Sequence, residues 1–258
     1  MQRAAIAALL VGAMSWGQSP QPRPSFEVAS VRVNTSNGAV DFVPRRSGDR
    51  VTMHNTRLVQ VIIYAYHVVN ASYQISGNYQ LPDGWNWYDI EAIAPGMPAE
   101  DNLRLMFQSL LEERFKIKVH RETRESPQYD LVIAKTGSKL KAADSESKIG
   151  AEGRFIGTGR AVIAGFNDGL HLMGKGATMD QLAASLSGQL RATVTDRTGL
   201  TGTFDYNVLF SRDDTPTDVA GPPPLTTAIQ EELGLKLETH KGSVEVLVID
   251  HVEKPSAN

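Results

Sequence analysis

The sequence predicts an α+β fold in which two similar halves each follow the order β-β-α-β-β-α-β-β. Two observations predict this fold. Apolar residues recur with the helical period of 3.6 in four short stretches, at residues 57–69, 102–114, 178–190 and 225–233. After each stretch the pattern changes to the alternation of polar and apolar residues that is typical of a β-strand. We therefore expect amphipathic helices that pack on one face of mostly antiparallel sheets.

The first half, which we place at residues 26–136, begins with the alternating segments FEVASVRV and RVTMHN, which predict two strands. The first helix is followed by the strands YQIS and WYDIEAIA, and the second helix is followed by FKIKVH and YDLVIAK. The charged segment RETRESPQ separates these last two strands, and its Pro127 predicts a turn between them. The half therefore contains two copies of a helix-strand-turn-strand unit.

The second half, residues 154–258, repeats this order. The strands GRAVIAG and GLHLMGKG precede a helix whose first turn carries a capping box made by Thr178 and Gln181. The strands ATVTD and TFDYNVLF follow this helix. Gly234 predicts the end of the last helix. Gly242 predicts the turn between the strands KLETH and SVEVLVID.

The segment between the halves, residues 137–153, is polar and has no periodicity, so it predicts a linker. Because the same change of period occurs in both halves, we expect an internal duplication. The halves form either two separate sheets or one continuous sheet, and the pattern does not distinguish between these arrangements.

The first residues are typical of a secretory signal. Arg3 is followed by the uncharged run AAIAALLVGAMSW and then by small residues, which predicts a signal peptide at 1–17 and cleavage before Gln18. Residues 18–25, QSPQPRPS, predict a proline-rich leader. A core helix or a membrane span is the alternative, but a span needs about 20 apolar residues. We therefore expect a secreted or periplasmic protein with no membrane span after cleavage.

Five segments of the chain together carry a resemblance to a known family. They are FEVASVRVN, IIYAYHV, FQSLLEERFKIKVHRETRESPQYDLVIAK, VTDRTGLTGTFDYNVLF and LGLKLETHKGSVEVLVIDHVEKPSAN. In these segments the chain resembles a family of secreted proteins of unknown function that is expanded in soil-dwelling acidobacteria and built on a single uncharacterised domain. The resemblance implies export and a bacterial origin. It implies no established activity, so no catalytic residue is carried over from the family.

The helix-strand-strand unit has a second, looser similarity. The stretch ATMDQLAASLSGQLRATVTDRTGLTGTFDYNVLF is similar to the N-terminal modules of secretins and TonB-dependent receptors. This similarity concerns the fold of one unit. It implies contact with other proteins of the cell envelope.

The composition excludes several classes of function. The chain has 26 Lys and Arg residues against 29 Asp and Glu residues, a formal net charge of −3, whereas nucleic-acid-binding proteins are usually basic, so we expect no nucleic-acid partner. Cysteine is absent from the sequence, which excludes disulfides, zinc-thiolate sites and thiol nucleophiles. The six histidines form no compact metal-binding pattern, and we expect neither a metal nor another cofactor.

Two of these histidines, His120 and His240, fall at similar places in their units. Symmetry-related ligands or acid–base groups are one interpretation. The alternation of their strands already explains them as residues of a polar strand face, and we favour that interpretation.

The segment LPDGWNWYDI contains the best candidates for surface recognition. Trp85 and Trp87 are two residues apart and therefore share one face of a strand, next to a Pro-Asp-Gly turn. Two tryptophans on one face are suited to stack on a sugar or to anchor a protein partner. The alternative is that both rings cover the first helix as part of the core.

A second candidate is the segment DRTGLTGTFDY. Asp196 and Arg197 precede a glycine-rich turn that either forms a ligand-binding loop or, as its residue types favour, is clamped by these two side chains as a hairpin connection.

The sequence contains no recognisable catalytic motif, and a G-x-S-x-G nucleophile elbow is absent. The function it predicts is therefore a non-enzymatic binding module of the envelope or the exterior, with an envelope protein or a glycan as its partner. A hydrolase that acts on carbohydrate or peptide is the alternative. Its candidate acidic residues are Asp89, Glu91, Asp130 and Asp205, which recur near the starts of strands.

Overall fold

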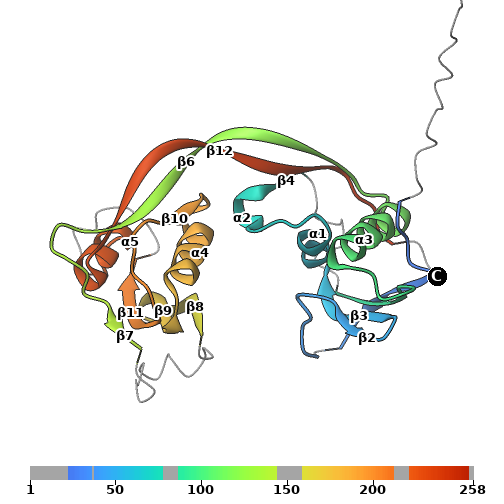
Figure 1. The fold of residues 1–258 in the computed structure, drawn as a ribbon, viewed down its shortest axis with the longest axis horizontal. Helices are drawn as coiled ribbons and strands as arrows, with labels where there is room; N and C mark the ends of the chain where they lie inside the picture. The colour runs from blue at the N-terminus through green and yellow to red at the C-terminus, as the bar shows by residue number, and fades with distance from the viewer. Residues whose placement is uncertain (1–22, 37, 78–86, 144–158, 212–220, 256–258) are drawn as a thin grey trace, which may run out of the picture.

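A computed structural model describes residues 23–36, 38–77, 87–143, 159–211 and 221–255 of the chain. These residues form two lobes joined by a long antiparallel pair of strands, β6 (Lys118–Ile133) and β12 (Leu235–His251), which arches from one lobe to the other (Figure 1). Helices pack on sheets in both lobes, and most strand pairs are antiparallel, so the α+β class is confirmed.

The first lobe is built on a sheet of four antiparallel strands in the order β1-β5-β3-β2. These strands are β1 (Val28–Asn34), β2 (Arg45–Ser47), β3 (Arg50–Arg57) and β5 (Trp87–Ile93). The helices of this lobe are α1 (Leu58–Ala65), α2 (Ala71–Gln74) and α3 (Glu100–Phe115), and α2 leads into β4 (Ile75–Gly77). The apolar stripes of α1 and α3 share one core with the inner face of the sheet.

The second lobe has a four-stranded antiparallel sheet in the order β7-β11-β9-β8. Its strands are β7 (Lys141–Ala142), β8 (Arg160–Phe166), β9 (Gly169–Ala177) and β11 (Phe204–Phe210). Its helices are α4 (Met179–Leu190) and α5 (Leu225–Ala228), and α5 continues into a π-helical turn, Ile229–Leu233. The predicted capping box of Thr178 and Gln181 and the left-handed Gly234 at the last helix end are confirmed.

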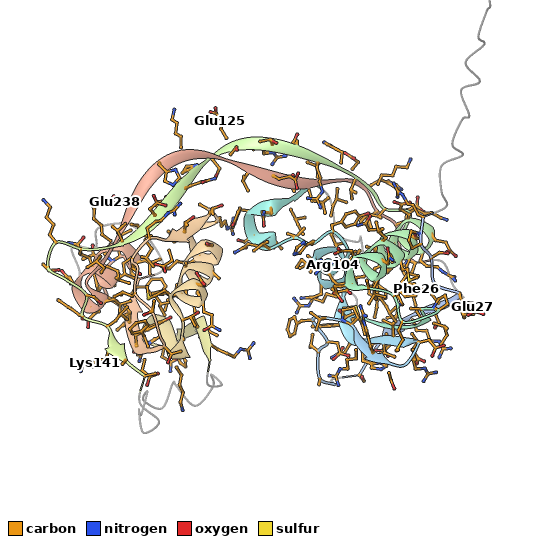
Figure 2. The ribbon with its side chains drawn as sticks, viewed as in Figure 1. Phe26, Glu27, Arg104, Glu125, Lys141 and Glu238 are labelled. Carbon is orange, nitrogen blue, oxygen red and sulfur yellow. The ribbon has the colours of Figure 1, made fainter. Side chains whose placement is uncertain are left out.

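A third sheet connects the lobes in the order β10-β6-β12-β4, where β10 is Val194–Asp196. Its central pair, β6 and β12, is the antiparallel ribbon of the arch. The outer strands are both parallel to their neighbours: β10 pairs with β6 in the second lobe, and β4 pairs with β12 in the first lobe. Between the lobes the ribbon projects side chains such as Glu125 outward (Figure 2).

The hairpins predicted at Pro127 and Gly242 are wrong, because β6 and β12 are each one unbroken strand and pair with each other. Pro127 lies opposite Lys241, and Gly242 lies opposite Ser126. A proline is tolerated on a strand edge, and β10 pairs with β6 only at residues 129–131, beyond Pro127. The absence of a side chain at Gly242 leaves room for the side chain of Gln128, since a Cβ at residue 242 would lie 2.2 Å from Cδ of Gln128.

Each lobe receives part of its core from a strand that begins in the other lobe. Leu247 and Ile249, near the end of β12, belong to the core of the first lobe. Leu131, near the end of β6, belongs to the core of the second lobe. The predicted burial of the helical stripes is confirmed for Phe107 and Leu186, which are both 0% exposed. The strand exchange therefore makes the packing of each lobe depend on a strand that begins in the other lobe.

Part of the predicted linker is folded. Residues 141–142 form the edge strand β7, and the backbone N–H of Lys139 donates to the carbonyl of Leu233. Residues 144–153 of the linker, the signal peptide at 1–17 and residues 18–22 of the leader lie outside the described residues. Among the helices that the structure describes, none is long and apolar enough to cross a membrane.

Candidate functional site

The outer face of the first sheet is turned away from the helices (Figure 1). Along β5, Tyr88 and Ile90 face the core and are 0% and 1% exposed. Because side chains alternate along a strand, Trp87, Asp89 and Glu91 lie on the outer face. This face therefore presents one of the two predicted tryptophans and two of the predicted carboxylates together.

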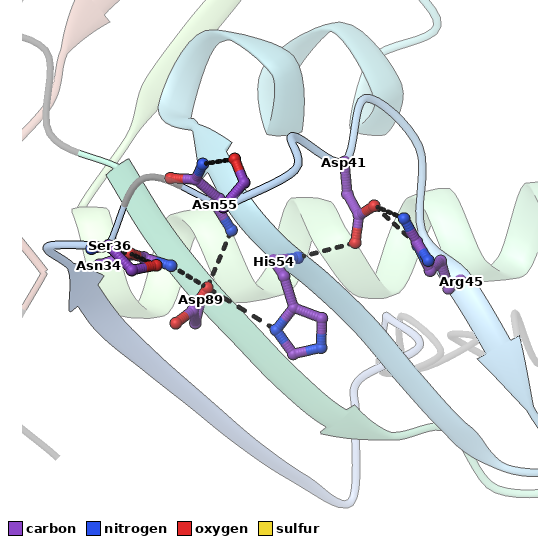
Figure 3. A network of polar contacts seen from close by, with 8 residues as sticks. Asn34, Ser36, Asp41, Arg45, His54, Asn55 and Asp89 are labelled. Carbon is purple, nitrogen blue, oxygen red and sulfur yellow. Dashed lines mark hydrogen bonds and ion pairs between the residues drawn. The ribbon is translucent and has the colours of Figure 1, made fainter.

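Asp89 is the centre of a polar network on this face (Figure 3). Its Oδ1 accepts a 2.8 Å hydrogen bond from the side-chain amide of Asn34 and another of 2.8 Å from the backbone N–H of Asn55. Asn55 has a positive φ of 48° and lies where the register of β3 and β5 shifts between Met53 and Thr56. This β-bulge turns the N–H of Asn55 toward the carboxylate.

The loop that covers the bulge is held by a second carboxylate. Asp41 is only 4% exposed, and its Oδ2 accepts the backbone N–H of His54 at 3.0 Å, while its Oδ1 accepts Nε of Arg45 at 2.7 Å. The side-chain amide of Asn55 donates to the carbonyl of Gly38 at 2.7 Å. The surroundings of Asp89 are therefore fixed by hydrogen bonds before any ligand arrives (Figure 3).

The electrostatics of the site keep Asp89 ionised. Burial raises the pKa of the Asp89 carboxyl, but the hydrogen bonds from Asn55 and Asn34 and the neighbouring His54 ring outweigh burial and hold the pKa below its ordinary value. Nδ1 of His54 lies 3.7 Å from Oδ1 of Asp89, and the His54 side chain is half-exposed. The site therefore presents a fixed negative charge beside an accessible imidazole.

The residues of this site do not form a catalytic triad. A Ser-His-Asp relay requires the serine hydroxyl to donate to the histidine. The hydroxyl of Ser36 instead donates to Oδ1 of Asn34 at 2.7 Å. The 3.7 Å between His54 and Asp89 is also longer than a hydrogen bond.

Trp87 begins β5 and lies opposite Arg57 of β3 and Asn34 of β1. The guanidinium carbon of Arg57 lies 4.3 Å from the centre of the Trp87 ring, which is a cation–π contact. Trp87 therefore packs beside a cation on the sheet face instead of joining the core with Tyr88. Trp85, the other predicted tryptophan, lies outside the described residues.

A shallow groove of ≈200 Å³ continues the outer face along the other end of β1 and β5. Val28 and Ile93 are among its apolar lining residues, and Arg32, Arg50 and Glu91 are its charged ones. Arg50 and Glu91 form an ion pair of 3.5 Å across the strands. The face thus has an aromatic end at Trp87 and a charged groove at its other end.

Asp196 and Arg197 lie in the second lobe, away from this face. Oδ1 of Asp196 accepts hydrogen bonds from the backbone N–H of Thr198 at 2.9 Å and from the Thr198 hydroxyl at 2.7 Å. The backbone N–H of Arg197 donates to the backbone carbonyl of Leu131 at 2.9 Å. The Asp196 side chain therefore holds the turn, whereas Nε of Arg197 lies 3.8 Å from Oδ1 of Asp130 on β6 and does not clamp the turn. The predicted hairpin is wrong, because β10 joins the central sheet whereas β11 joins the sheet of the second lobe.

The remaining predicted carboxylates have structural partners. Oδ1 of Asp205 accepts the backbone N–H of Gly176 at 2.6 Å. Asp130 lies 3.5 Å from Nε2 of His240. The other predicted histidine, His120, has a partner that was not predicted: its Nδ1 lies 2.9 Å from Asp250. Both histidines are about half-exposed on polar strand faces. In the described part of the chain no group of three or more His, Asp or Glu side chains is placed to hold a metal ion.

The sequence patterns did not identify the partners of Asp89. An asparagine inside a strand is a signal for the bulge at Asn55, because asparagine tolerates positive φ better than most residues. A second missed cluster surrounds His171, which is 5% exposed and lies 2.9 Å from Oδ1 of Asn207 and 3.0 Å from Oδ1 of Asp168. Both ring nitrogens of His171 are engaged in these contacts.

The fold and the site define a two-lobed α+β protein with a polar, aromatic-edged sheet face exposed to solvent. The chain belongs to a family of proteins of unknown function, DUF3738, whose model matches residues 59–252. Comparison with curated proteins and with solved structures gives no match for this chain. Trp87 and Asp89 lie inside the matched region, whereas Asn34 and His54 precede it.

Proposed function

We propose that this protein is an exported, non-enzymatic binding module that recognises a glycan through the outer face of the first sheet. One observation carries the proposal: the Trp87 ring is fixed by Arg57 on the strand that also holds the ionised Asp89. A sugar offers an apolar face that stacks on an aromatic ring and hydroxyl groups that bond to fixed polar side chains. The outer face supplies both kinds of contact within one strand.

The alternative function, a hydrolase of carbohydrate or peptide, has less support. A glycosidase needs a carboxyl whose pKa is raised, so that it acts as a general acid beside a second carboxylate. The pKa of Asp89 is instead lowered, and its neighbour Glu91 is in an ion pair with Arg50. These observations favour binding.

The test is a glycan array probed with residues 18–258. We expect saturable binding to a subset of glycans. Trp87→Ala removes the stacking surface. Stacking of a nucleobase on an aromatic ring contributes on the order of 1–3 kcal/mol, and we expect a similar contribution from a sugar face, so the variant should lower the affinity about tenfold. Trp87→Phe keeps a ring and should retain part of the affinity.

The matched control is Asp101→Asn, which removes a carboxylate that is 93% exposed on α3, away from the outer face. This variant should bind like the unchanged protein. A pull-down from the envelope of the producing cell runs in parallel. Capture of an envelope protein without any glycan binding, or full glycan binding by Trp87→Ala, contradicts the proposal.

Export is part of the same proposal. Its support is the charged, apolar and small-residue order of residues 1–17. Mass spectrometry of the protein from the producing cell should find an N-terminus near Gln18. Mature protein that retains Met1 in the cytosol contradicts export. Contact with other envelope proteins, which the similarity to secretin and TonB-receptor modules implies, stays a prediction that the pull-down tests.

We also propose that the two lobes descend from one duplicated unit. The orders β1-β5-β3-β2 and β7-β11-β9-β8 support this, because each strand has a counterpart at the same place in the other lobe. The central sheet supports it as well. Residues 247–249 pair with β4 as residues 129–131 pair with β10. In a duplicated unit, β6 and β12 are then counterparts that exchange places between the lobes.

A further inference from the structure

A second depression, of ≈570 Å³, lies on the first lobe where α3 ends and β6 begins. Arg23, from the described part of the leader, and Tyr66, at the C-terminal end of α1, both line it. The other polar residues that line it are Gln108, Glu112, Lys116 and Lys118. None of these residues belongs to the outer face of the sheet.

Tyr66 is the buried polar group of this depression. The residue is 7% exposed, and its hydroxyl is buried without a hydrogen-bond partner. Burial, followed by the charge of Glu112, raises the pKa of Tyr66 to about 12 against the opposing charges of Arg23 and Arg121. Tyr66 itself lines the depression, and the charges of two further lining residues, Arg23 and Glu112, reach its hydroxyl. A buried donor without an acceptor is unusual and calls for an explanation.

The walls carry an excess of positive charge. Arg23 forms an ion pair with Glu112. Lys116 and Lys118 form no ion pair among the residues that the structure describes. Lys116 ends α3 with a left-handed φ of 51°, and Ile117 between the two lysines is 3% exposed. Lys116 and Lys118, on either side of the buried Ile117, are both exposed to solvent.

We propose that this depression binds a small anion that carries phosphate or carboxylate groups. The anion accepts a hydrogen bond from the Tyr66 hydroxyl, and its charge is balanced by Lys116 and Lys118. Hydrogen bonds to a charged acceptor are stronger than those between neutral groups, so an anion is the ligand that best satisfies this hydroxyl. The hydroxyl is out of contact with solvent, so a wall side chain must turn aside on binding. Arg23, whose side chain is 62% exposed, can do so because its ion pair with Glu112 lies at the surface, where such pairs are weak.

The test is a calorimetric and NMR titration of residues 18–258 with inorganic phosphate and, separately, with citrate. We expect saturable binding of at least one of them at a single site. Tyr66→Phe removes only the hydroxyl and should weaken binding about tenfold, because a hydrogen bond to a charged group is lost. The same variant should keep the melting temperature of the unchanged protein or raise it, since an unsatisfied buried group disappears.

Lys116→Gly is the second variant, and it separates binding from folding. Glycine suits the left-handed conformation at residue 116, as Gly234 does with a φ of 66° at the last helix end, so the variant should fold at least as well. It should nevertheless bind the anion about fivefold more weakly, through loss of one charge. Lys236→Ala, on β12 in the second lobe and beside Glu238, is the control and should bind normally.

Several outcomes overturn the proposal. One is the absence of saturable binding of either anion. Another is equal binding by the unchanged protein, Tyr66→Phe and Lys116→Gly, which means an adventitious ion only. Binding to phosphatidylglycerol vesicles without binding of free phosphate or citrate also overturns it, because the ligand is then a membrane surface and not a small anion. These outcomes leave glycan binding at Trp87 untouched, so the two proposals fail independently.

Discussion

The guanidinium of Arg57 lies 4.3 Å from the centre of the Trp87 ring, and the two residues are direct partners across β3 and β5. Arg57 is also the residue immediately before α1, and its backbone N–H donates to the side chain of Gln60 at 3.1 Å. The contact therefore links the start of a core helix to the edge of the candidate site. It restricts the indole to one orientation without removing it from the sheet face.

Arg57→Ala should loosen this tryptophan and cost a small amount of stability. An exposed cation–π contact contributes about 0.5–1 kcal/mol, so the free energy of unfolding should fall by about that amount. Iodide quenching of tryptophan fluorescence, measured in a Trp85→Phe background, should increase because the guanidinium no longer covers one face of the ring. Arg57→Lys keeps the cation and is the control. Equal quenching in all three proteins contradicts the contact.

Asp89 predicts a specific dependence of stability on pH. Its pKa is lower in the folded protein than in the unfolded chain, where the pKa of an aspartate is about 3.9. The stabilisation is therefore fully present above the unfolded pKa, and it is lost as the pH falls through the folded pKa. Asp89→Asn should lower the free energy of unfolding at pH 7, and the difference from the unchanged protein should shrink toward about pH 2.

Urea unfolding at a series of pH values measures this difference. The control is Asp101→Asn, whose carboxylate is 93% exposed and contacts only Arg104 among the ion pairs of the described residues. Its effect should be small at every pH, because surface ion pairs contribute at most about 1 kcal/mol. If the free energy of unfolding of Asp89→Asn differed from that of the unchanged protein by the same amount from pH 7 to acid, the charge of Asp89 would have no part in its role.

The helices and their buried faces were predictable from the sequence, and the ribbon was not. Phe107 and Leu111 are 0% exposed because each helix packs one side on a core, which forces an apolar stripe with period 3.6. Leu190, predicted from the same kind of stripe, is only partly buried because it lies at the last residue of α4. Between the lobes, the middle of β6 has solvent on both faces, and Arg124 and Glu125 are both exposed. No buried face exists there to impose an alternation, so the strand has the composition of a charged loop.

The candidate site was only half predictable for a related reason. Trp87 follows from the alternation of a strand. The bonds to Asp89 come from a bulge at Asn55 and from Asn34 at the end of another strand, and no period relates these positions. Their meeting depends on the pairing of β1, β5 and β3, which is a tertiary property.

The parallel pairing of β4 with β12 can be tested at a glycine. Gly77 has a φ of 93°, and a Cβ there would lie 2.2 Å from the backbone oxygen of Ile249. Gly48 also has a positive φ, 61°, but a Cβ there would meet nothing within 4 Å. Gly48→Ala should therefore cost about 1–2 kcal/mol from the backbone alone. Gly77→Ala should cost roughly 1–3 kcal/mol more, because the strands must also move apart.

Thermal and urea unfolding of both variants provide the comparison. The pairing at Gly77 joins residues that are far apart in the sequence. Its loss should also loosen the last residues of β12, which amide hydrogen exchange at Val248 and Ile249 would detect. Equal losses of stability in Gly77→Ala and Gly48→Ala would mean that β4 does not lie against β12.

The exchange of strands between the lobes has a direct chemical test, because the chain contains no cysteine. Glu125 lies opposite Ser243 near the middle of the ribbon. Directly opposed residues of antiparallel strands have Cα atoms about 4.5–5.5 Å apart, which is within the range that a disulfide bridges. Glu125→Cys combined with Ser243→Cys should therefore oxidise to an intramolecular disulfide, detected by mass spectrometry after digestion without reductant.

The matched control combines Glu125→Cys with Glu238→Cys. Glu238 lies opposite Asp130, so it is five residues away from Glu125 along β6. At about 3.4 Å per residue this separation is far beyond the reach of a disulfide. The control should keep two free thiols under the same oxidation. If β6 and β12 each folded back on themselves at Pro127 and Gly242, Glu125 would face its own strand, and the first pair would stay reduced as well. Formation of the 125–243 disulfide in the monomer, with free thiols in the control, is the result expected of two lobes that complete each other's cores.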